Sequence, residues 1–278
     1  MTPAARVQAA IDLLDLIIAA ARDQGAAADT LIARWFAERR YAGSKDRRAI
    51  RDLVYAAIRR VSDRPDSGRA AMVGLAADRP DLAALFDGSG YGPAPIAAGE
   101  AAAPAGVVPG WLVPRLSALV GADERSALID RAPLDLRINR LKADRSAVMP
   151  LLPDATPTPH APDGLRLIDN IPIEQSDLWK NGAIEIQDEG SQLLALACAA
   201  QPGMTVIDLC AGAGGKSLAL AAAMAGRGHI LATDIVRDRL QRLAPRAARA
   251  GASIVETRLL DDGREAEALA DMVGSADL

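Results

Sequence analysis

A glycine-rich turn links an apolar segment to a helix-forming one. The stretch "DLCAGAGGKS", residues 208–217, overlaps the apolar run "TVIDL" at its start and the run "KSLALAAAM" at its end. Glycines between a strand and a helix let a ligand approach the backbone closely, and the free N–H groups of a helix N-terminus attract polar or anionic ligand groups. The turn is therefore the first candidate for a ligand-binding site.

The spacing of the glycines tests which ligand this is. An ATP-binding P-loop needs glycine five residues before the glycine of Gly-Lys-Ser, and Cys210 stands there. The dinucleotide pattern fits Gly212 and Gly214, but its third glycine falls on Ser217. Asp234 ends the next apolar run, "HILATD", 20 residues after Gly214, where a carboxylate can accept hydrogen bonds from ribose hydroxyls. The pattern indicates an adenosine-type ligand and leaves a dinucleotide and S-adenosylmethionine both open.

The elements that must position this turn alternate between strand and helix. The apolar runs predict strands at 205–209, 229–234 and 253–257, and helices at 191–200, 216–224 and 236–250. This alternation predicts a parallel sheet with right-handed crossovers, with the ligand beyond the carboxyl ends of the strands.

The residues before position 187 read differently. Apolar stripes predict helices in the first 86 residues, with Asp29-Thr30 as a cap of the second helix and Ser44 before the third. Residues 88–110, rich in Gly, Pro and Ala, predict a loop, and 111–121 a further helix.

A small mixed segment precedes the alternating part. "PLDLRINRL" alternates apolar and polar residues and predicts a strand with one buried face, and the proline-rich stretch 150–162 predicts a loop. The expected fold is multidomain: an all-α N-terminal domain with its linker (1–130), a small α+β module (131–180) and the first half of an α/β domain (181–278).

Basic residues concentrate in the helical part. The chain has a net charge of −4, yet residues 34–60 hold nine basic residues against three acidic ones. One interpretation is a solvated helical face, and the other is a surface that contacts nucleic-acid phosphates. The candidate phosphate contacts are Arg39, Arg40, Lys45, Arg47, Arg48 and Arg51.

The two cysteines, Cys198 and Cys210, match no zinc-binding spacing and no disulfide framework, which favours a reducing cytoplasm. Asp12 and Asp15 interrupt the apolar N-terminal run, and no other stretch approaches a membrane span. Cys198, in an apolar helix, is expected in the core. We therefore expect a cytoplasmic protein without a metal site or membrane contact.

Three stretches of the chain resemble a known family. "QDEGSQLLALACAAQPGMTVIDLCAGAGGKS" is similar to the opening of the catalytic domain of the Fmu/Sun/RsmB-type ribosomal RNA (cytosine-5) methyltransferases, and "PLDLRINRLKADR" matches the strand that precedes it. "DRRAIRDLVYAAIRR", residues 46–60, resembles the NusB-like helical RNA-binding domain of the bacterial members. The resemblance implies a NusB-like domain at 1–130 and a class I, Rossmann-like methyltransferase domain from 181, with small-subunit ribosomal RNA as partner and a monomer when full length.

The resemblance also assigns roles in binding S-adenosylmethionine. It places Asp234 on the ribose and Asp262 near the adenine, with Asp261 as the alternative if the register differs by one. Gln187 and Asp188 are candidates for the methionine end, although Asp188 fits a helix N-cap equally well. The implied turn contacts are Cys210, Ala211, Gly212, Ala213, Gly214, Gly215 and Lys216. Ala213 replaces the proline that is usual in the family, which frees the backbone angle φ.

The implied reaction needs a cysteine that this chain lacks. In the family, a cysteine thiolate adds to C6 of cytosine so that C5 can take the methyl group. The expected Thr-Cys and Asp-Ala-Pro-Cys elements are absent, and Cys210 lies in the cofactor turn, so we expect truncation before the catalytic cysteines and an inactive chain. The truncation would also leave an unpaired, apolar edge on strand 205–209, which favours association.

Two other functions stay open at this point. One is a non-catalytic RNA-binding or ribosome-assembly factor that retains the cofactor fold. The other is a nicotinamide-dependent oxidoreductase, which only the loose glycine pattern favours.

Overall fold

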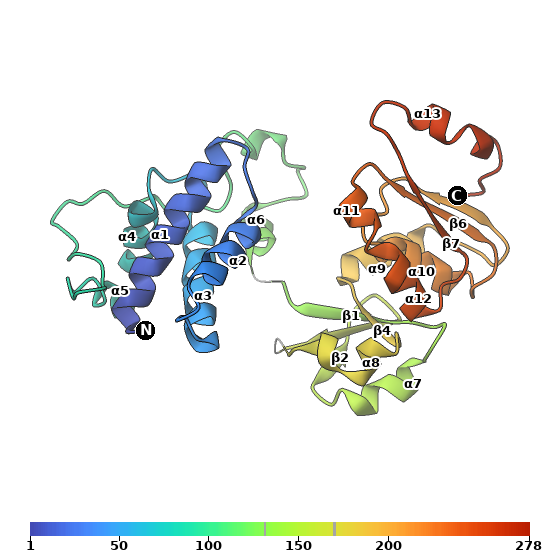
Figure 1. Cartoon of the computed structure of the whole chain (residues 1–278), viewed down its shortest axis with the longest axis horizontal. Helices are drawn as coiled ribbons and strands as arrows, with labels where there is room; N and C mark the ends of the chain where they lie inside the picture. The colour runs from blue at the N-terminus through green and yellow to red at the C-terminus, as the bar shows by residue number, and fades with distance from the viewer. Residues whose placement is uncertain (131, 169–170) are drawn as a thin grey trace. The chain divides into compact units, whose positions relative to one another are not determined.

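A computed structural model describes residues 1–130, 132–168 and 171–278. The chain divides into two compact units, Met1–Arg131 and Ala132–Leu278, each with its own core (Figure 1). No helix in the described ranges is both long enough and apolar enough to cross a membrane.

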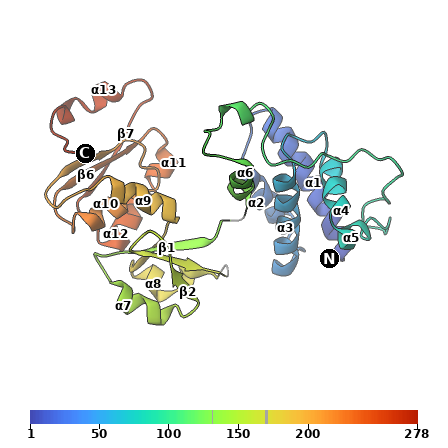
Figure 2. The ribbon, with the colours of Figure 1, turned by 180° about the vertical axis from the view of Figure 1, so that it is seen from behind.

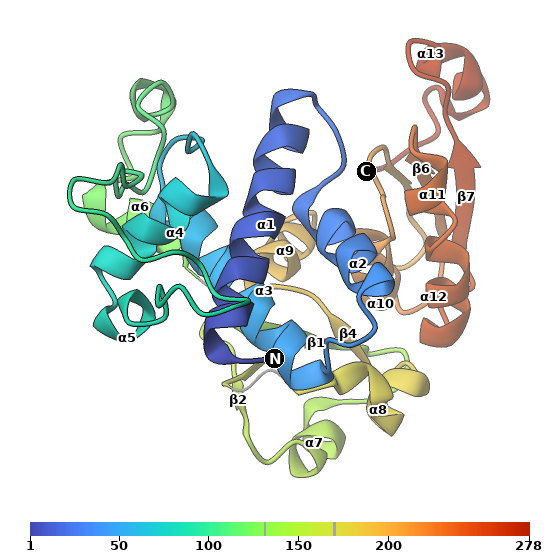
Figure 3. The same ribbon diagram turned by 60° about the vertical axis from the view of Figure 1, so that its left-hand side comes forward.

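The first unit is helical. Its longest helix, α1, packs against α2, α3 and α4 (Figure 3), and Leu13, Ile32, Ile50 and Met72 fill the core between them. Gly68 opens α4 where a Cβ would lie 2.3 Å from the carbonyl oxygen of Ile11, so only glycine permits this approach to α1. The helices are α1 (Pro3–Arg22), α2 (Ala28–Glu38), α3 (Ser44–Arg60), α4 (Gly68–Ala77), α5 (Pro80–Ala83), the 3₁₀ turn η1 (Val113–Arg115) and α6 (Ala122–Ile129).

Three local predictions in this unit are wrong. Ala27 is the N-cap of α2, so Asp29 lies inside the first turn, where its charge suits the helix dipole. Gly43 is the N-cap of α3, and Ser44 is its first helical residue. The helix predicted over 111–121 is reduced to η1, which contains Pro114, because proline lacks the N–H that a longer helix needs.

The second unit begins with a four-stranded antiparallel sheet in the order β2-β3-β1-β4. Leu136 and Ile138 of β1 pack on one face of the sheet with Leu165 and Ile184. The elements are β1 (Leu134–Ile138), α7 (Arg145–Val148), η2 (Met149–Leu151), β2 (Ala155–Pro157), β3 (Gly164–Leu167), η3 (Ile173–Gln175), α8 (Asp177–Lys180) and β4 (Ile184–Ile186).

Strand β1 is buried on both faces. Asp135 and Arg137, which the sequence places on a solvent face, are only 4% and 5% exposed, so the prediction of one buried face is wrong. Helix α9 packs against β1 and removes that second face from water. The proline-rich loop also contains the short strand β2, whose ladder with β3 the composition does not reveal.

A three-stranded parallel sheet in the order β5-β6-β7 completes the second unit (Figure 2), as the alternation predicts. The helix predicted over 236–250 is divided into α11 and α12, and Gly251 ends it with φ of 73°. The elements are α9 (Glu189–Ala197), β5 (Thr205–Asp208), α10 (Gly215–Ala223), β6 (His229–Asp234), α11 (Arg237–Leu240), α12 (Leu243–Ala250), β7 (Val255–Leu259), α13 (Glu265–Ala268) and η4 (Ala270–Met272).

The outer edge of β5 is partly paired. The N–H of Ile207 donates to Leu278 O (2.9 Å), and the N–H of Asp277 donates to Thr205 O (2.8 Å). The carboxylate of Asp277 also accepts the N–H of Thr205 at 2.8 Å. The prediction of a bare, apolar β5 edge is therefore wrong where these residues lie against it.

Candidate cofactor site

The glycine turn has a conformation that requires its glycines. Gly212 and Gly214 have φ of 55° and 85°, in the left-handed region that residues with a Cβ rarely adopt. A Cβ on Gly214 would also lie 2.5 Å from Cγ of Leu243. The turn is anchored by the N–H of Ala211, which donates to Thr233 O at 2.9 Å, and by that of Gly214, which donates to Ala211 O at 2.8 Å.

The bend faces Asp234, as the spacing predicts. The N–H of Gly212 donates to Asp234 Oδ2 at 2.9 Å, and the N–H of Val236 donates to Oδ1 at 2.7 Å. Asp234 is only 7% exposed. An ionised carboxylate can accept about four hydrogen bonds, so each oxygen retains capacity for a ligand hydroxyl.

A cavity of about 430 Å³ adjoins the turn. Cys210, Ala211, Gly215 and Lys216 contribute to its wall, and so do Gln187 and Asp188 from the segment between β4 and α9. The remaining lining residues are Pro133, Leu134, Asp135, Ile186, Ser191, Asp208 and Arg246. Gly212, Ala213, Gly214 and Asp234 are not in this lining; they meet at the bend itself.

Asp262 and Asp261 follow β7 at the same edge of the sheet. The N–H of Leu260 donates to Asp234 O at 3.0 Å, which brings the segment beside the end of β6. Both aspartates are exposed. Neither aspartate is among the residues that line the cavity, and the contact that brings this segment to Asp234 is made by the backbone of Leu260.

Asp188 has a structural role whatever it binds. Its carboxylate accepts the N–H and the hydroxyl of Ser191, both at 2.8 Å, and thereby caps α9. Partial desolvation raises the pKa of Asp188, but these donors outweigh it and leave the pKa below its ordinary value. The N-cap interpretation is confirmed.

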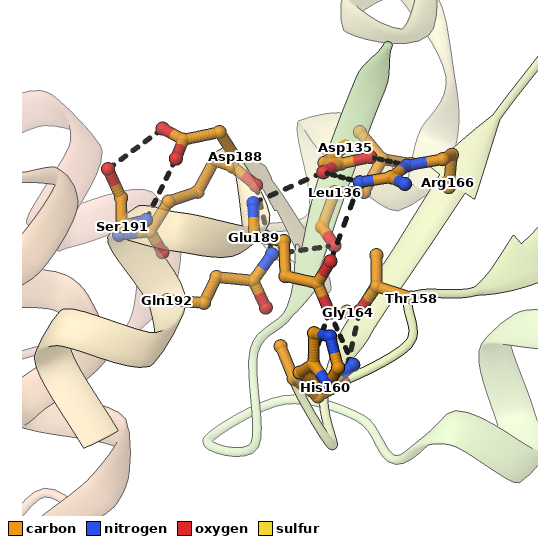
Figure 4. A network of polar contacts seen from close by, with 12 residues as sticks. Asp135, Leu136, Thr158, His160, Gly164, Arg166, Asp188, Glu189, Ser191 and Gln192 are labelled. Carbon is orange, nitrogen blue, oxygen red and sulfur yellow. Dashed lines mark hydrogen bonds and ion pairs between the residues drawn. The ribbon is translucent and has the colours of Figure 1, made fainter. Parts of the chain in front are cut away.

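A polar network holds α9 against the antiparallel sheet (Figure 4). Asp135 pairs with Arg166 through two bonds of 2.7 and 2.8 Å and accepts the N–H of Glu189 at 3.1 Å. Glu189 in turn accepts the N–H groups of His160 and Ala161 at 2.5 and 2.9 Å. This network fixes Gln187 and Asp188 in the cavity wall, because they lie between β4 and α9.

The side-chain contacts that support the turn escape the sequence analysis. The buried Ser217 hydroxyl donates to Asp208 Oδ2 at 2.7 Å, which joins the end of β5 to the start of α10. Gln187 Nε2 donates to Gly215 O at 3.2 Å. Arg246 donates to Ala213 O at 2.7 Å and to Glu185 Oε2 at 2.8 Å. Ser217 and Asp208 lie within the quoted motif, but nothing in the sequence pairs Arg246 with Glu185.

Glu185 is the buried centre of this arrangement. It is 1% exposed and forms ion pairs with both Arg246 and Arg249. Arg249 also donates to Trp179 O at 2.8 Å, and its guanidinium lies 3.7 Å from the centroid of the Trp179 ring. The glycine turn is thus connected through Arg246 to a strand of the antiparallel sheet.

The six basic candidates of the helical unit are not equivalent. Arg39 lies 4.2 Å from the centroid of the Trp35 ring, and Arg47 donates to Ala42 O at 2.7 Å, so both are partly buried. The other four are exposed: Arg40, Lys45, Arg48 and Arg51. These four form what we call the basic surface.

The two cysteines differ from expectation in one case. Cys210 is exposed at the turn, but Cys198 is also exposed, at the end of α9, so the prediction that it belongs to the core is wrong. Within the described ranges, no group of three or more His, Cys, Asp and Glu side chains is arranged to hold a metal ion.

Comparisons with known proteins agree with the geometry. Residues 195–273 match the family model described as 16S rRNA methyltransferase RsmB/F. Over 167 residues the chain is 29% identical to the probable ribosomal RNA small subunit methyltransferase B of Bacillus subtilis, covering 57% of this chain and 37% of the relative. Over 151 residues it is 34% identical to ribosomal RNA small subunit methyltransferase B of Salmonella paratyphi C, covering 51% and 35%.

The crystal structure of PH0851 aligns with the whole chain and with 73% of its own chain, at a TM-score of 0.62 and 20% identity, which shows a shared fold. The chain spans little more than a third of the length of the two curated relatives. The matches confirm the resemblance to the Fmu/Sun/RsmB-type methyltransferases, and S-adenosylmethionine is the cofactor that this resemblance implies.

Replacing Arg246 by methionine is expected to weaken S-adenosylmethionine binding about tenfold, because the carbonyl of Ala213 loses the charged donor that holds the turn. Arg249 still compensates Glu185 in this variant. Arg242→Met, an exposed position just before α12, is the matched control. Calorimetric titration measures both, and equal affinity for the two variants would show that the bond does not position the turn.

Proposed function

We propose that this chain contributes the cofactor-binding part and an RNA-binding domain to an enzyme that methylates C5 of a cytosine in small-subunit ribosomal RNA. The contact between Gly212 and Asp234 carries the proposal, since it brings the turn and the carboxylate together at the carboxyl edge of a parallel sheet. The RsmB/F match over 195–273 supports ribosomal RNA as the substrate. The helical unit is proposed to be NusB-like.

The residues of the chain would divide the work of holding the cofactor. Asp234 accepts hydrogen bonds from the ribose hydroxyls, and Asp262, or Asp261, lies toward the adenine. Gln187 and Asp188 face the methionine end from the cavity wall, together with Lys216. The bound cofactor supplies an electrophilic methyl group. The chain orients that group and keeps the turn rigid through the bonds to Ala211 and Ala213.

Neither cysteine of the chain is placed to attack cytosine. Cys210 lies in the cofactor turn, and Cys198 is exposed at the end of α9. We therefore propose that the cysteine-linked intermediate forms on a residue outside this chain. We also propose a monomeric, cytoplasmic enzyme.

The chain alone is expected to bind S-adenosylmethionine but to transfer no methyl group to ribosomal RNA. Calorimetric titration with S-adenosylmethionine and with NAD tests the first part, and tritium transfer from labelled cofactor to 16S ribosomal RNA tests the second. Preference for NAD would overturn the assignment in favour of an oxidoreductase. Tritium incorporation at C5 would show that Cys210 or Cys198 serves as the nucleophile.

Charge reversal on the basic surface is expected to weaken RNA binding at least tenfold and to reduce its salt dependence. Each lost phosphate contact lowers the slope of log K against log salt by about 0.9 or less. The test compares a variant with Arg40, Lys45, Arg48 and Arg51 all changed to glutamate with the wild type across a salt series. The single variant Arg48→Glu is also compared with Arg22→Glu, at the exposed end of α1, which makes the same change in net charge outside the basic surface. An unchanged slope would show that these residues form a solvated helical face and do not contact phosphate.

A non-catalytic RNA-binding or assembly factor is the second candidate. The position of both cysteines favours it, because this chain by itself holds the cofactor fold without a nucleophile. Both candidates require RNA binding by the helical unit. Methyl transfer by a protein that contains this chain together with a cysteine-bearing second half would separate them.

A further inference from the structure

A second cavity in the Ala132–Leu278 unit shares no residue with the cofactor cavity. It measures about 230 Å³ and lies among β1, α9 and α10. Small side chains, including Ala195, Ala219 and Ala222, form one part of its wall. The other part is polar and consists of Arg137, Arg140, Asp163 and Gln192.

Arg137 is a buried charge without a carboxylate partner. It is 5% exposed, and its Nε donates to the neutral Gln187 Oε1 at 2.6 Å. Across the described ranges, its two terminal nitrogens donate to no protein acceptor, and no carboxylate forms an ion pair with it. Its cross-strand neighbour Glu185 is already paired with Arg246 and Arg249.

The surroundings make this charge costly. Burial lowers the pKa of Arg137 to about 10, although the nearby carboxylates of Glu185 and Asp163 oppose this change, and the guanidinium stays charged at neutral pH. Asp163, in the same cavity, is paired with Arg140 at 3.2 Å. A buried guanidinium that no carboxylate contacts directly is unfavourable, and an anion in the cavity would lower that penalty.

Gln192 adds a second unmet requirement. It is 2% exposed, and its Nε2 donates to Leu136 O at 3.2 Å and to Gln187 O at 2.9 Å. These bonds fix the orientation of the amide, as Figure 4 shows. Its Oε1 is buried and accepts no hydrogen bond from the part of the chain that the structure describes. A ligand that satisfies both groups therefore needs a hydrogen-bond donor, such as a hydroxyl, as well as negative oxygens.

We infer that this cavity is a binding site for a phosphate group with a neighbouring hydroxyl. The phosphate oxygens accept hydrogen bonds from the terminal nitrogens of Arg137, and the hydroxyl donates to Gln192 Oε1. Arg140, whose side chain is 65% exposed, attracts the anion from solvent. The alanines leave room for the group because they carry no longer side chain. The site does not depend on the proposed methyltransferase function.

The phosphate chemistry has two sources. Free phosphate carries its own P–OH, and an RNA phosphodiester has a 2′-hydroxyl beside it, whereas DNA has none. Sulfate matches the charge and shape of phosphate but has no proton to donate at neutral pH. Phosphate is therefore expected to bind at least tenfold more tightly than sulfate.

The first experiment measures the melting temperature of the whole chain with inorganic phosphate, with sulfate and with chloride at equal ionic strength. A saturable rise with phosphate is expected in the wild type and in Arg227→Met, an exposed arginine that lies outside the cavity lining. Arg137→Met and the cavity-filling Ala222→Leu should lose it. Arg137→Met should fold, since replacing a buried unpaired charge by an apolar side chain is often neutral or stabilising. If phosphate raises the melting temperature of all four proteins equally, or of none of them, the proposed site is wrong.

The second experiment identifies the source with matched RNA and DNA oligonucleotides. If the phosphate belongs to RNA, Arg137→Met weakens RNA binding about tenfold, and the wild type prefers RNA to DNA. If the source is free phosphate, Arg137→Met binds RNA as tightly as the wild type does. The rise of the melting temperature with phosphate is then still lost in Arg137→Met and Ala222→Leu. Cofactor titration of Ala222→Leu, which leaves the bond between Arg137 and Gln187 in place, gives an independent readout, so failure of this site and failure of the proposed function are distinguishable.

Discussion

Replacing Asp234 by alanine is expected to reduce affinity for S-adenosylmethionine about 100-fold, because hydrogen bonds to a charged group contribute roughly 1.5–3 kcal/mol each. The carboxylate has two uses here. It accepts the N–H of Gly212 at 2.9 Å and so fixes the bend, and it is the proposed acceptor for the ribose hydroxyls. Alanine removes both at once. Calorimetric titration gives the change in Kd directly.

One variant separates these uses of Asp234, and a second serves as the control. Asp234→Asn keeps an oxygen that can accept the N–H of Gly212, so its affinity should fall between those of alanine and the wild type. Asp238→Ala, on the neighbouring helix α11, should bind as the wild type does. If Asp234→Ala retains wild-type affinity while folding normally, the ribose assignment is wrong and the cofactor lies elsewhere.

Removing the carboxylate of Glu185 is expected to destabilise the second unit by about 3–5 kcal/mol, the usual cost of breaking a buried ion pair. Glu185 is 1% exposed, and Glu185→Ala leaves Arg246 and Arg249 without their counter-charge. Urea unfolding followed by circular dichroism measures the free energy of unfolding.

Glu256→Ala is the matched control for that measurement. Glu256 also contacts two basic side chains, His229 and Arg258, but its side chain is 54% exposed. Pairs at such exposed positions contribute about 0–1 kcal/mol, so this variant should unfold almost as the wild type does. Equal losses in the two variants would mean that the burial of Glu185 does not strengthen its contribution.

The sequence predicts the parallel sheet well because its signals are local. The run "HILATD" has an apolar centre and ends in an acidic residue, and β6 has those bounds, His229–Asp234. The meeting of Gly212 and Asp234 is also predictable, because the carboxyl ends of adjacent parallel strands lie at one edge. Where proline intervenes, as in 111–121, apolar content alone predicts too much helix.

The support around the site is not predictable in the same way. Arg246 and Glu185 are 61 residues apart, and they meet because a helix of the α/β part packs on a strand of the antiparallel sheet. The burial of Arg137 has the same origin, since an alternating strand is expected to expose its polar face unless another element covers it. Such contacts depend on how two sheets pack together, and a single sequence does not encode that packing in any local pattern.

The connection from Ala213 through Arg246 to Glu185 has a thermodynamic consequence. A ligand that tightens the bend stabilises the conformations in which Arg246 stays bonded to Ala213 and Glu185. Opening of β4 breaks this arrangement, because Glu185 belongs to that strand. By reciprocity, the factor by which the closed arrangement of β4 raises ligand affinity equals the factor by which bound ligand shifts β4 toward that closed arrangement. The antiparallel sheet thus contributes to ligand affinity, although its strands carry no residue of the glycine motif.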